Sequence, residues 1–325
     1  MSYTFGEKIK VTLFGQSHGE AMGAVIDGIP AGFEVDFEKL REFMLRRAPG
    51  GKMSTQRKET DEVKIISGIF EGKTCGAPLC GIIENKDVID SDYDKLKLVP
   101  RPSHADYPAF VKYGGFNDYR GGGALSGRIT APLCFAGGII LQLLEKQGIG
   151  IKTEICEIGE KKNPIEDEIE KIISGARAKG DSVGGKIRCT VTGVPAGKGS
   201  PIFEGLDSVI AHSVFAVPGI KGIEFGETLA YGSLNNDAYE IENGSVITKS
   251  NRQGGMAGGI SNGMPVVFTC TVKPAPSIAT EQNSIDLSTN ENVKLTVGGR
   301  HDPCILPRVM PAIEAAAALA LIQEL

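Results

Sequence analysis

Three of the chain's four histidines lie in short segments rich in glycine, proline and polar residues. His18 belongs to GQSHGE, His104 to RPSHAD and His301 to RHDPC. Hydroxyl and carboxyl side chains stand close to them in the sequence, namely Ser17, Glu20, Ser103, Asp106 and Asp302. Because imidazole titrates near neutrality, and loops at strand ends are where such groups reach a substrate, this pattern predicts general acid–base chemistry.

Other interpretations of these residues are weaker. His212 lies in the helical run 207–217, where a lone histidine is typical of a packed or half-exposed residue. A Ser-His-Asp hydrolase is conceivable, but Ser17 is adjacent to His18, which seldom gives a triad geometry. The seven cysteines form no CxxC pair and no short-spaced Cys/His group, so we expect no metal site.

A cluster of basic residues occupies the segment LRRAPGGKMSTQRK. Arg46, Arg47, Lys52 and Arg57 fall within about a dozen residues in a chain whose net charge is −5. Guanidinium groups match phosphate and carboxylate geometry, and the neighbouring Gly, Ser and Thr residues are typical of an anion-binding loop. A solvated helix end, whose cations offset the helix dipole, is the alternative. We favour a site for a small polyanion.

Glycine clusters occur at 119–128 (YRGGGALSGR), 254–263 (GGMAGGISNG) and 297–300 (VGGR). Glycine lets backbone N–H groups approach a phosphate, and the first cluster precedes a helix expected to begin near Ser126. None has the spacing of a dinucleotide-binding turn or a P-loop. Together with the histidines and the basic segment, they predict a phosphorylated organic cofactor and an anionic substrate.

The composition restricts the class of protein. Aromatic residues make up 6% of the chain and tryptophan is absent, which disfavours nucleic-acid binding in an acidic protein. An odd number of cysteines without disulfide spacing, and an N-terminal segment without a secretion signal, predict a cytoplasmic location. The apolar run 129–144 is shorter than the roughly 20 residues of a membrane span. We therefore expect a buried helix and no membrane association.

Short apolar runs bounded by Gly or Pro predict the elements that position these loops. Strands are expected at 9–14, 63–67, 79–84, 186–192 and 265–272. A helix is expected at 36–47, with Phe37, Leu40, Phe43 and Met44 on one face and Asp36 as its cap. No linker or break in composition interrupts the 325 residues, so we predict a single domain over 1–325.

The two halves of the chain repeat short motifs in the same order. GIPAG at 28–32, PG at 49–50 and GAP at 76–78 are matched by GVPAG at 193–197, PG at 218–219 and GMP at 263–265. Each half then ends in an Ala-rich helix introduced by an arginine and a proline, Arg128 in the first and Arg308 in the second. This order predicts a duplicated strand–helix–strand unit, with pseudo-repeats at roughly 1–148 and 149–325.

The longest motifs resemble those of the chorismate synthase family. In order they are GQSHGE, RRAPGG with STQRKETD, SGIFEGKTCGAPL, RPSHADYPAFVKYG, DYRGGG, VPAGKG, GGISNG with VKPAPSI, and GRHDPC. The resemblance runs from about residue 6 to 322, effectively the whole chain. It implies an α+β fold, built as a β-α-β sandwich with internal pseudo-duplication and usually assembled as a homotetramer.

The resemblance also implies a reaction. The family converts 5-enolpyruvylshikimate 3-phosphate to chorismate and inorganic phosphate by a trans vinylogous elimination, the last common step of the shikimate pathway for aromatic amino acid biosynthesis. It requires reduced FMN (FMNH2) although there is no net redox change. NADPH is a candidate reductant, and the sequence leaves open whether the chain reduces its own flavin or depends on an outside source.

By motif, the resemblance assigns roles to single residues. His18 would protonate the departing phosphate, and His104 would protonate or hold the reduced flavin. Asp302, with Ser17 as a supporting hydroxyl, would tune the flavin nitrogen that takes the ring proton. Substrate or NADPH phosphate would bind to Arg46, Arg47, Lys52 and Arg57.

Flavin contacts are implied for four segments and one arginine. They map onto Ala124, Leu125, Ser126, Pro218, Gly219, Gly258, Lys273, Pro274, Ala275, Pro276, Ser277 and Arg300. Many family members have GGGRSSARET where this chain has GGGALSGRIT, so Ala124 and Leu125 supply no polar side chain there.

Three alternatives remain beside this hypothesis. One is a related flavin-dependent lyase with a different substrate. Another is a non-catalytic nucleotide-binding module, which would not need acids in two separate loops. The third is RNA binding through the basic segment, which the acidic balance and the scarcity of aromatic residues disfavour.

Overall fold

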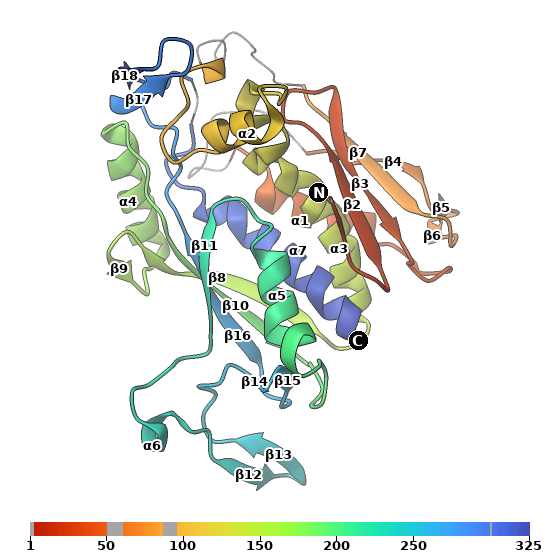
Figure 1. Cartoon of the computed structure of the whole chain (residues 1–325). Coiled ribbons are helices and arrows are strands. Elements are labelled where there is room, and N and C mark those ends of the chain that lie inside the picture. The colour runs from red at the N-terminus through yellow and green to blue at the C-terminus, as the bar shows by residue number, and fades with distance from the viewer. Residues whose placement is uncertain (1–2, 51–60, 87–95, 300) are drawn as a thin grey trace.

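The computed structural model describes residues 3–50, 61–86, 96–299 and 301–325. Two antiparallel sheets enclose a layer of helices (Figure 1). The first sheet contains, in spatial order, β1 (Thr4–Phe5), β2 (Lys10–Gly15), β3 (Ala21–Asp27), β7 (Leu79–Glu84) and β4 (Lys64–Ser67). The second contains β11 (Ile220–Phe225), β16 (Val266–Val272), β10 (Gly185–Thr192), β8 (Gly150–Ile158) and β9 (Lys161–Lys162). This arrangement confirms the expected α+β class and β-α-β sandwich.

Two long helices form the centre of the core. They are α3 (Thr130–Glu145) and α7 (Leu306–Glu324), flanked by α1 (Phe37–Arg47) and α5 (Leu206–Val214). At Gly137 of α3 a Cβ would overlap the Cβ of Ala315 in α7, so glycine permits the close crossing of the two helices. The alternation of buried and exposed residues along β7 and β16 shows that one face of each sheet packs on this layer.

The segments 127–145 and 306–324 are, within the described residues, long and apolar enough to cross a membrane by length and composition. In each segment, most of the apolar 18-residue stretch is buried inside the protein: 83% in the first segment and 78% in the second. The helix expected at 129–144 is therefore confirmed as a buried core helix.

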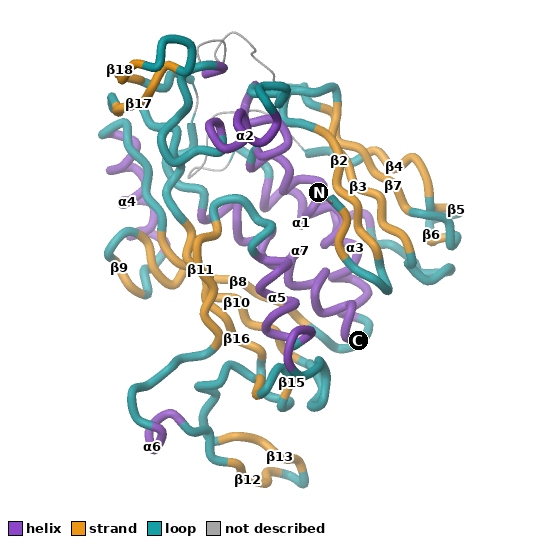
Figure 2. Tube along the Cα trace, viewed as in Figure 1, coloured by secondary structure: helices purple, strands orange, loops and turns teal. Residues whose placement is uncertain are grey.

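Smaller elements surround the sandwich (Figure 2). They include α2 (Asp106–Tyr113), α4 (Glu166–Ala178) and the 3-10 helices η2 (Arg120–Leu125) and η3 (Gly127–Ile129), with η4 (Ile202–Glu204) before α5. Paired short strands are β5 (Ile69–Phe70) with β6 (Lys73–Thr74), β14 (Met256–Ala257) with β15 (Ile260–Ser261), and β17 (Gln282–Asp286) with β18 (Glu291–Leu295). A projecting arm contains α6 (Gly232–Asn235), β12 (Tyr239–Glu242) and β13 (Ser245–Thr248).

The predicted elements agree with the structure to within one residue at most ends. The five expected strands are β2, β4, β7, β10 and β16. Helix α1 begins after Asp36, whose carboxylate accepts a hydrogen bond from the backbone N–H of Lys39 at 2.9 Å. Leu40 and Met44 are buried as expected, whereas Phe37 is 39% exposed. Strands β3, β8 and β11 were not predicted, because Gly and charged residues interrupt their apolar runs.

Candidate active site

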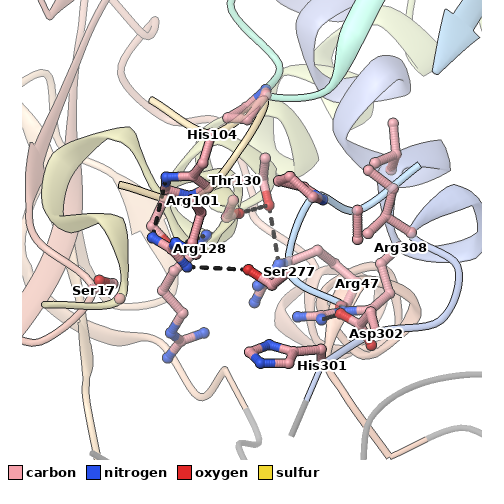
Figure 3. Close-up of a pocket in the computed structure, with 18 of the residues that line it drawn as sticks. Ser17, Arg47, Arg101, His104, Arg128, Thr130, Ser277, His301, Asp302 and Arg308 are labelled. Carbon is pink, nitrogen blue, oxygen red and sulfur yellow. Dashed lines mark hydrogen bonds and ion pairs between the residues drawn. The ribbon is translucent and has the colours of Figure 1, made fainter. Parts of the chain in front are cut away.

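A cleft opens at the N-terminal ends of the core helices α3 and α7 (Figure 3). It has a cavity volume of about 230 Å³ and is partly open to solvent. Its polar and charged lining consists of Ser17, His18, Arg47, Arg101, His104, Ser126, Arg128, Thr130, Ser277, His301, Asp302 and Arg308.

The loop that carries His18 joins β2 to β3. Gly15 begins it with a φ of 102°, and a Cβ there would lie 2.6 Å from the Cβ of Met22, so the turn requires glycine. The letters GQSHG match the G-x-S-x-G pattern of hydrolases, but a nucleophile turn joins a strand to a helix, and this one joins two strands. The hydrolase alternative therefore has no structural support.

Ser17 determines which nitrogen of His18 carries a hydrogen. The buried Ser17 hydroxyl donates to the backbone carbonyl of Arg120 at 3.0 Å, and its oxygen lies 3.1 Å from Nδ1 of His18. Because the carbonyl uses the only hydroxyl proton, we assign the ring hydrogen to Nδ1, which donates to Ser17 Oγ. In this tautomer the Nε2 atom of the neutral ring can take up and release a proton.

His104 is held by a carboxylate that is itself held by an arginine. Its Nδ1 donates to Oδ1 of Asp106 at 2.6 Å, and Asp106 accepts Nε and Nη2 of Arg101 at 2.8 and 2.9 Å. Burial lowers the pKa of His104, and the charges of Arg101 and Lys273 lower the pKa further, against the opposing effect of Asp106. The imidazole is therefore neutral at neutral pH, with its hydrogen on Nδ1.

Two guanidiniums share one buried carboxylate beside the start of α3. The Asp61 side chain is 0% exposed and accepts hydrogen bonds from both Arg47 and Arg128. Burial alone would raise the pKa of the Asp61 carboxyl, but the two neighbouring positive charges and their hydrogen bonds hold that pKa below its ordinary value. Among the described side chains, this wall of the cleft therefore has two guanidiniums for one carboxylate.

The start of α7 presents a balanced pair instead. Arg308 donates to the carboxylate of Asp302, and its Nε donates to the backbone carbonyl of Arg47 at 3.0 Å. The neighbouring ring of His301 has Nε2 2.7 Å from the carbonyl of Gly298, so we assign that nitrogen as the hydrogen donor.

The cleft as a whole favours negative charge. Four guanidiniums line it, against the three carboxylates of Asp61, Asp106 and Asp302. The N-terminal turns of α3 and α7 also reach it, and helix N-termini carry partial positive charge and N–H groups without partners within the helix. The arrangement suits a small molecule with several negative charges.

All four predicted catalytic residues and several of the predicted ligand contacts meet in this cleft. Those that line it are Ser17, His18, Arg47, His104, Ser126, Pro218, Ala275, Pro276, Ser277 and Asp302. These residues come from both halves of the chain, which only the packing of the two sheets on α3 and α7 brings together.

Other predicted residues lie elsewhere. Arg46 donates two hydrogen bonds of 2.7 Å to Glu314 of α7 and does not line the cleft. Gly258 lies in the turn between β14 and β15, by the far end of β16 (Figure 1). Near the cleft but outside its lining are Ala124, Leu125, Gly219, Lys273 and Pro274. Lys52, Arg57 and Arg300 are outside the described residues.

The sequence did not identify Asp61, Arg101 or Thr130 as site residues, and it noted Arg128 and Arg308 only as the first residues of Ala-rich helices. The signal that could have found Arg128 and Arg308 is their position, because a helix that begins at a cleft presents its first side chains to it. Asp61 has no such signal, since its role depends on two partners distant in sequence. In the described part of the chain, no group of three His, Cys, Asp or Glu residues is placed to hold a metal ion.

A cationic cleft with two loop imidazoles, built on the starts of two core helices, defines an enzyme for a small polyanionic substrate. Residues 9–325 match the family model for chorismate synthase. Chorismate synthases from Lancefieldella parvula and Pyrococcus abyssi are 41% and 42% identical to the chain, over 100% and 98% of its length and 96% of theirs. A crystal structure of a chorismate synthase has a TM-score of 0.76 and 25% identity, covering 98% of this chain and 92% of that one.

The chain therefore belongs to the chorismate synthase family. Its activity is that of a carbon–oxygen lyase acting on phosphates, in aromatic amino acid biosynthesis.

Proposed function

We propose that the chain converts 5-enolpyruvylshikimate 3-phosphate to chorismate and inorganic phosphate in the presence of reduced FMN. The carbon–oxygen bond to phosphate breaks, a ring proton leaves and a second ring double bond forms, so no net oxidation occurs. The observation that carries the proposal is the meeting of two loop imidazoles, four guanidiniums and two helix N-termini in one cleft.

The guanidiniums offset the charge of the substrate, which has two carboxylates and a phosphate. Arg47 and Arg128 supply the positive charge in excess of Asp61, and their shared carboxylate holds both side chains in place before the substrate arrives. Such preorganised donors stabilise negative charge without reorganisation during the reaction.

His18 supplies the acid for the leaving phosphate. Its Nδ1 is committed to Ser17, so Nε2 is the atom that carries the transferable proton. Phosphate leaves more easily when it is protonated, and a positioned general acid contributes roughly 10²–10⁴-fold to a rate.

The cleft also fits a flavin. Pro218, Pro276 and Ile305 give it apolar surface, and at Gly127 a Cβ would meet nothing within 4 Å, which leaves room beside the start of α3. Ser126, Pro218 and 275–277 would hold the group. When bound, reduced FMN supplies electron density to the substrate ring and a nitrogen that accepts the ring proton.

His104 and Asp302 act on the cofactor side of the reaction. The neutral imidazole of His104, anchored through Nδ1, offers Nε2 as a hydrogen-bonding atom that holds the reduced cofactor. Asp302 carries a negative charge that Arg308 already compensates, so this carboxylate tunes its surroundings without repelling the substrate strongly.

We also propose a cytoplasmic homotetramer with internal pseudo-duplication, which uses NADPH as the source of electrons for the flavin. Seven cysteines present as free thiols support the reducing compartment. Exposed Tyr239, Ile241 and Val246 on the projecting arm support contact with other subunits. The two five-stranded sheets that enclose α3 and α7 support the duplication. Sedimentation analysis of the purified protein tests the tetramer.

The reaction is tested under anaerobic conditions. The protein is mixed with dithionite-reduced FMN and 5-enolpyruvylshikimate 3-phosphate, and chorismate absorbance is followed together with released phosphate. Equal amounts of both products, absent with oxidised FMN alone, are expected. Oxidised FMN with NADPH then tests whether the chain reduces its own flavin. Flavin binding without product would indicate a different substrate, and no flavin binding would refute the proposal.

Single substitutions test the two imidazoles. We expect His18→Ala and His104→Ala to lower turnover by about a hundredfold or more, because each removes a group that acts on the substrate or the cofactor. His212→Ala is the matched control, since this ring packs edge-on against Phe5 at 5.5 Å within the fold. Turnover within about threefold of the parent for His18→Ala would contradict its role.

A further inference from the structure

The glycine loop before α3 lies against both imidazoles. A Cβ built on Gly121 would be closer than 3.0 Å to Cε1 and Nδ1 of His18, and 2.8 Å from Oγ of Ser17. A Cβ on Gly122 would be 3.1 Å from Cε1 and 3.4 Å from Nε2 of His104. Two consecutive residues therefore each leave room, through the missing side chain, for one of the two histidines.

The backbone of this loop is anchored to the segment that carries His18. The N–H of Ser17 donates to the carbonyl of Gly123 at 3.2 Å, and the N–H of Gly122 donates to the carbonyl of Tyr119 at 3.2 Å. Gly121 and Gly122 have φ/ψ of 57°/13° and 86°/3°, in the left-handed region. Glycine adopts this conformation at no steric cost, so the loop can follow the imidazoles closely.

We propose that Gly121 and Gly122 are positioning residues for the two imidazoles, with Gly121 acting through His18 and Gly122 through His104. The catalytic importance of the two histidines rests on the proposed function, whereas the contacts between the glycine loop and the imidazoles do not depend on it. A side chain at 121 would push the His18 ring away from Ser17 and break the bond that determines its tautomer. A side chain at 122 would meet the Cε1–Nε2 edge of His104, so this ring would shift less.

The difference between the two glycines predicts unequal effects. We expect Gly121→Ala to lower turnover by about a hundredfold, close to the loss of a general acid. Gly122→Ala should lower it by about tenfold, because a Cβ contact of 3.1 Å needs a shift of only a few tenths of an ångström.

Gly114→Ala is the matched control for backbone strain. Gly114 has φ/ψ of 60°/31°, close to Gly121, but a Cβ there meets only Phe116, at 3.9 Å. The left-handed conformation penalises an alanine similarly at both positions, and the contacts with His18 and Ser17 are what distinguishes Gly121. Turnover of Gly114→Ala within about threefold of the parent is expected.

Double variants show whether each glycine acts through its histidine. In a His18→Ala background the clash with the ring is removed and the Cβ at 121 meets only the rotatable hydroxyl of Ser17, so adding Gly121→Ala should lower turnover little further and should lower the melting temperature about as much as Gly114→Ala does. Gly122→Ala should behave in the same way in a His104→Ala background. Full additivity with the matching histidine variant would overturn the proposal.

The ring signals of the histidines give a readout that does not depend on activity. With only four histidines, imidazole NMR resonances can be assigned from the single His→Ala variants. Gly121→Ala should change the pH titration of His18 and leave that of His104 nearly unchanged, and Gly122→Ala should do the reverse. These shifts are expected even if the substrate proves to be different. Unchanged His18 titration in a folded Gly121→Ala protein would refute the inference.

Discussion

The starts of the two core helices bring an arginine into the same cleft, but with different partners. Arg128, before α3, shares the carboxylate of Asp61 with Arg47, and all three side chains are at most 6% exposed. Arg308, in the first turn of α7, is paired with Asp302, and these two side chains are 18% and 11% exposed. A similar sequence position therefore produces an excess positive charge at α3 and a balanced pair at α7.

The difference shows that the number of arginines that share a carboxylate determines which wall attracts an anion, since each wall has one of these carboxylates and the α3 wall has two guanidiniums. Coulomb interactions between buried groups are screened less than those between exposed groups. The two buried guanidiniums that share Asp61 therefore act more strongly on a substrate than the exposed cations of the surface. The α3 wall suits the phosphate or carboxylates, and the α7 wall suits a partner of lower charge.

The largest expected effect comes from breaking the shared carboxylate. Asp61→Asn would leave two buried guanidiniums without a countercharge, and removing one partner of a buried ion pair costs about 3–5 kcal/mol. Asp302→Asn should cost clearly less, because its pair is partly open to solvent. Denaturant unfolding of both variants measures the two free energies. Equal losses of stability would contradict the contrast between the walls.

A smaller effect is expected on anion binding. Arg128→Gln leaves Asp61 paired with Arg47 alone, so the excess charge disappears and the affinity for inorganic phosphate should fall by about tenfold, or about 1.4 kcal/mol. The control is Arg308→Gln combined with Asp302→Asn, which removes a balanced pair and should change the affinity by no more than threefold. Thermal shifts at increasing phosphate concentration report both affinities. A greater loss in the control would reverse the assignment of the walls.

The pH dependence tests the side of the cleft that carries His104. Asp106 raises the pKa of His104 against the lowering effect of burial, so Asp106→Asn should lower that pKa further. Any acid limb of the rate profile that arises from protonation of His104 should then move to lower pH. NMR titration of the ring, alongside the rate profile, checks the direction. A shift of both to higher pH would show that Asp106 does not act as a nearby negative charge.

The smallest effect is expected at Ser277. Its hydroxyl accepts a hydrogen bond from Nη1 of Arg101 at 3.1 Å, while Asp106 already holds the rest of that guanidinium. Ser277→Ala should therefore raise KM by about threefold, which corresponds to one hydrogen bond of about 0.5–1 kcal/mol, with little change in kcat. Steady-state kinetics separate the two constants. A large fall in kcat would indicate direct contact with the reacting groups.

Much of the fold could be predicted because its signals are local. Strands such as β7 and β16 are short apolar runs bounded by Gly or Pro, and α1 combines an apolar face with the Asp36 cap. Strand β8 was missed because its exposed positions carry lysine and glutamate, which hide its apolar face. The sequence also predicted that His18 and His104 lie in loops, because strand ends and glycine clusters can be recognised from neighbouring residues alone.

The site depended on contacts that no local pattern contains. Arg46 and Arg47 are adjacent at the end of α1, and the sequence treated them alike. Consecutive residues of a helix point about 100° apart, so Arg46 reaches Glu314 in the core while Arg47 reaches Asp61 at the cleft. The sequence by itself determined the residue types, the elements and the family motifs. Only the tertiary structure decided which guanidinium faces the substrate, because the partner carboxylates come from distant segments.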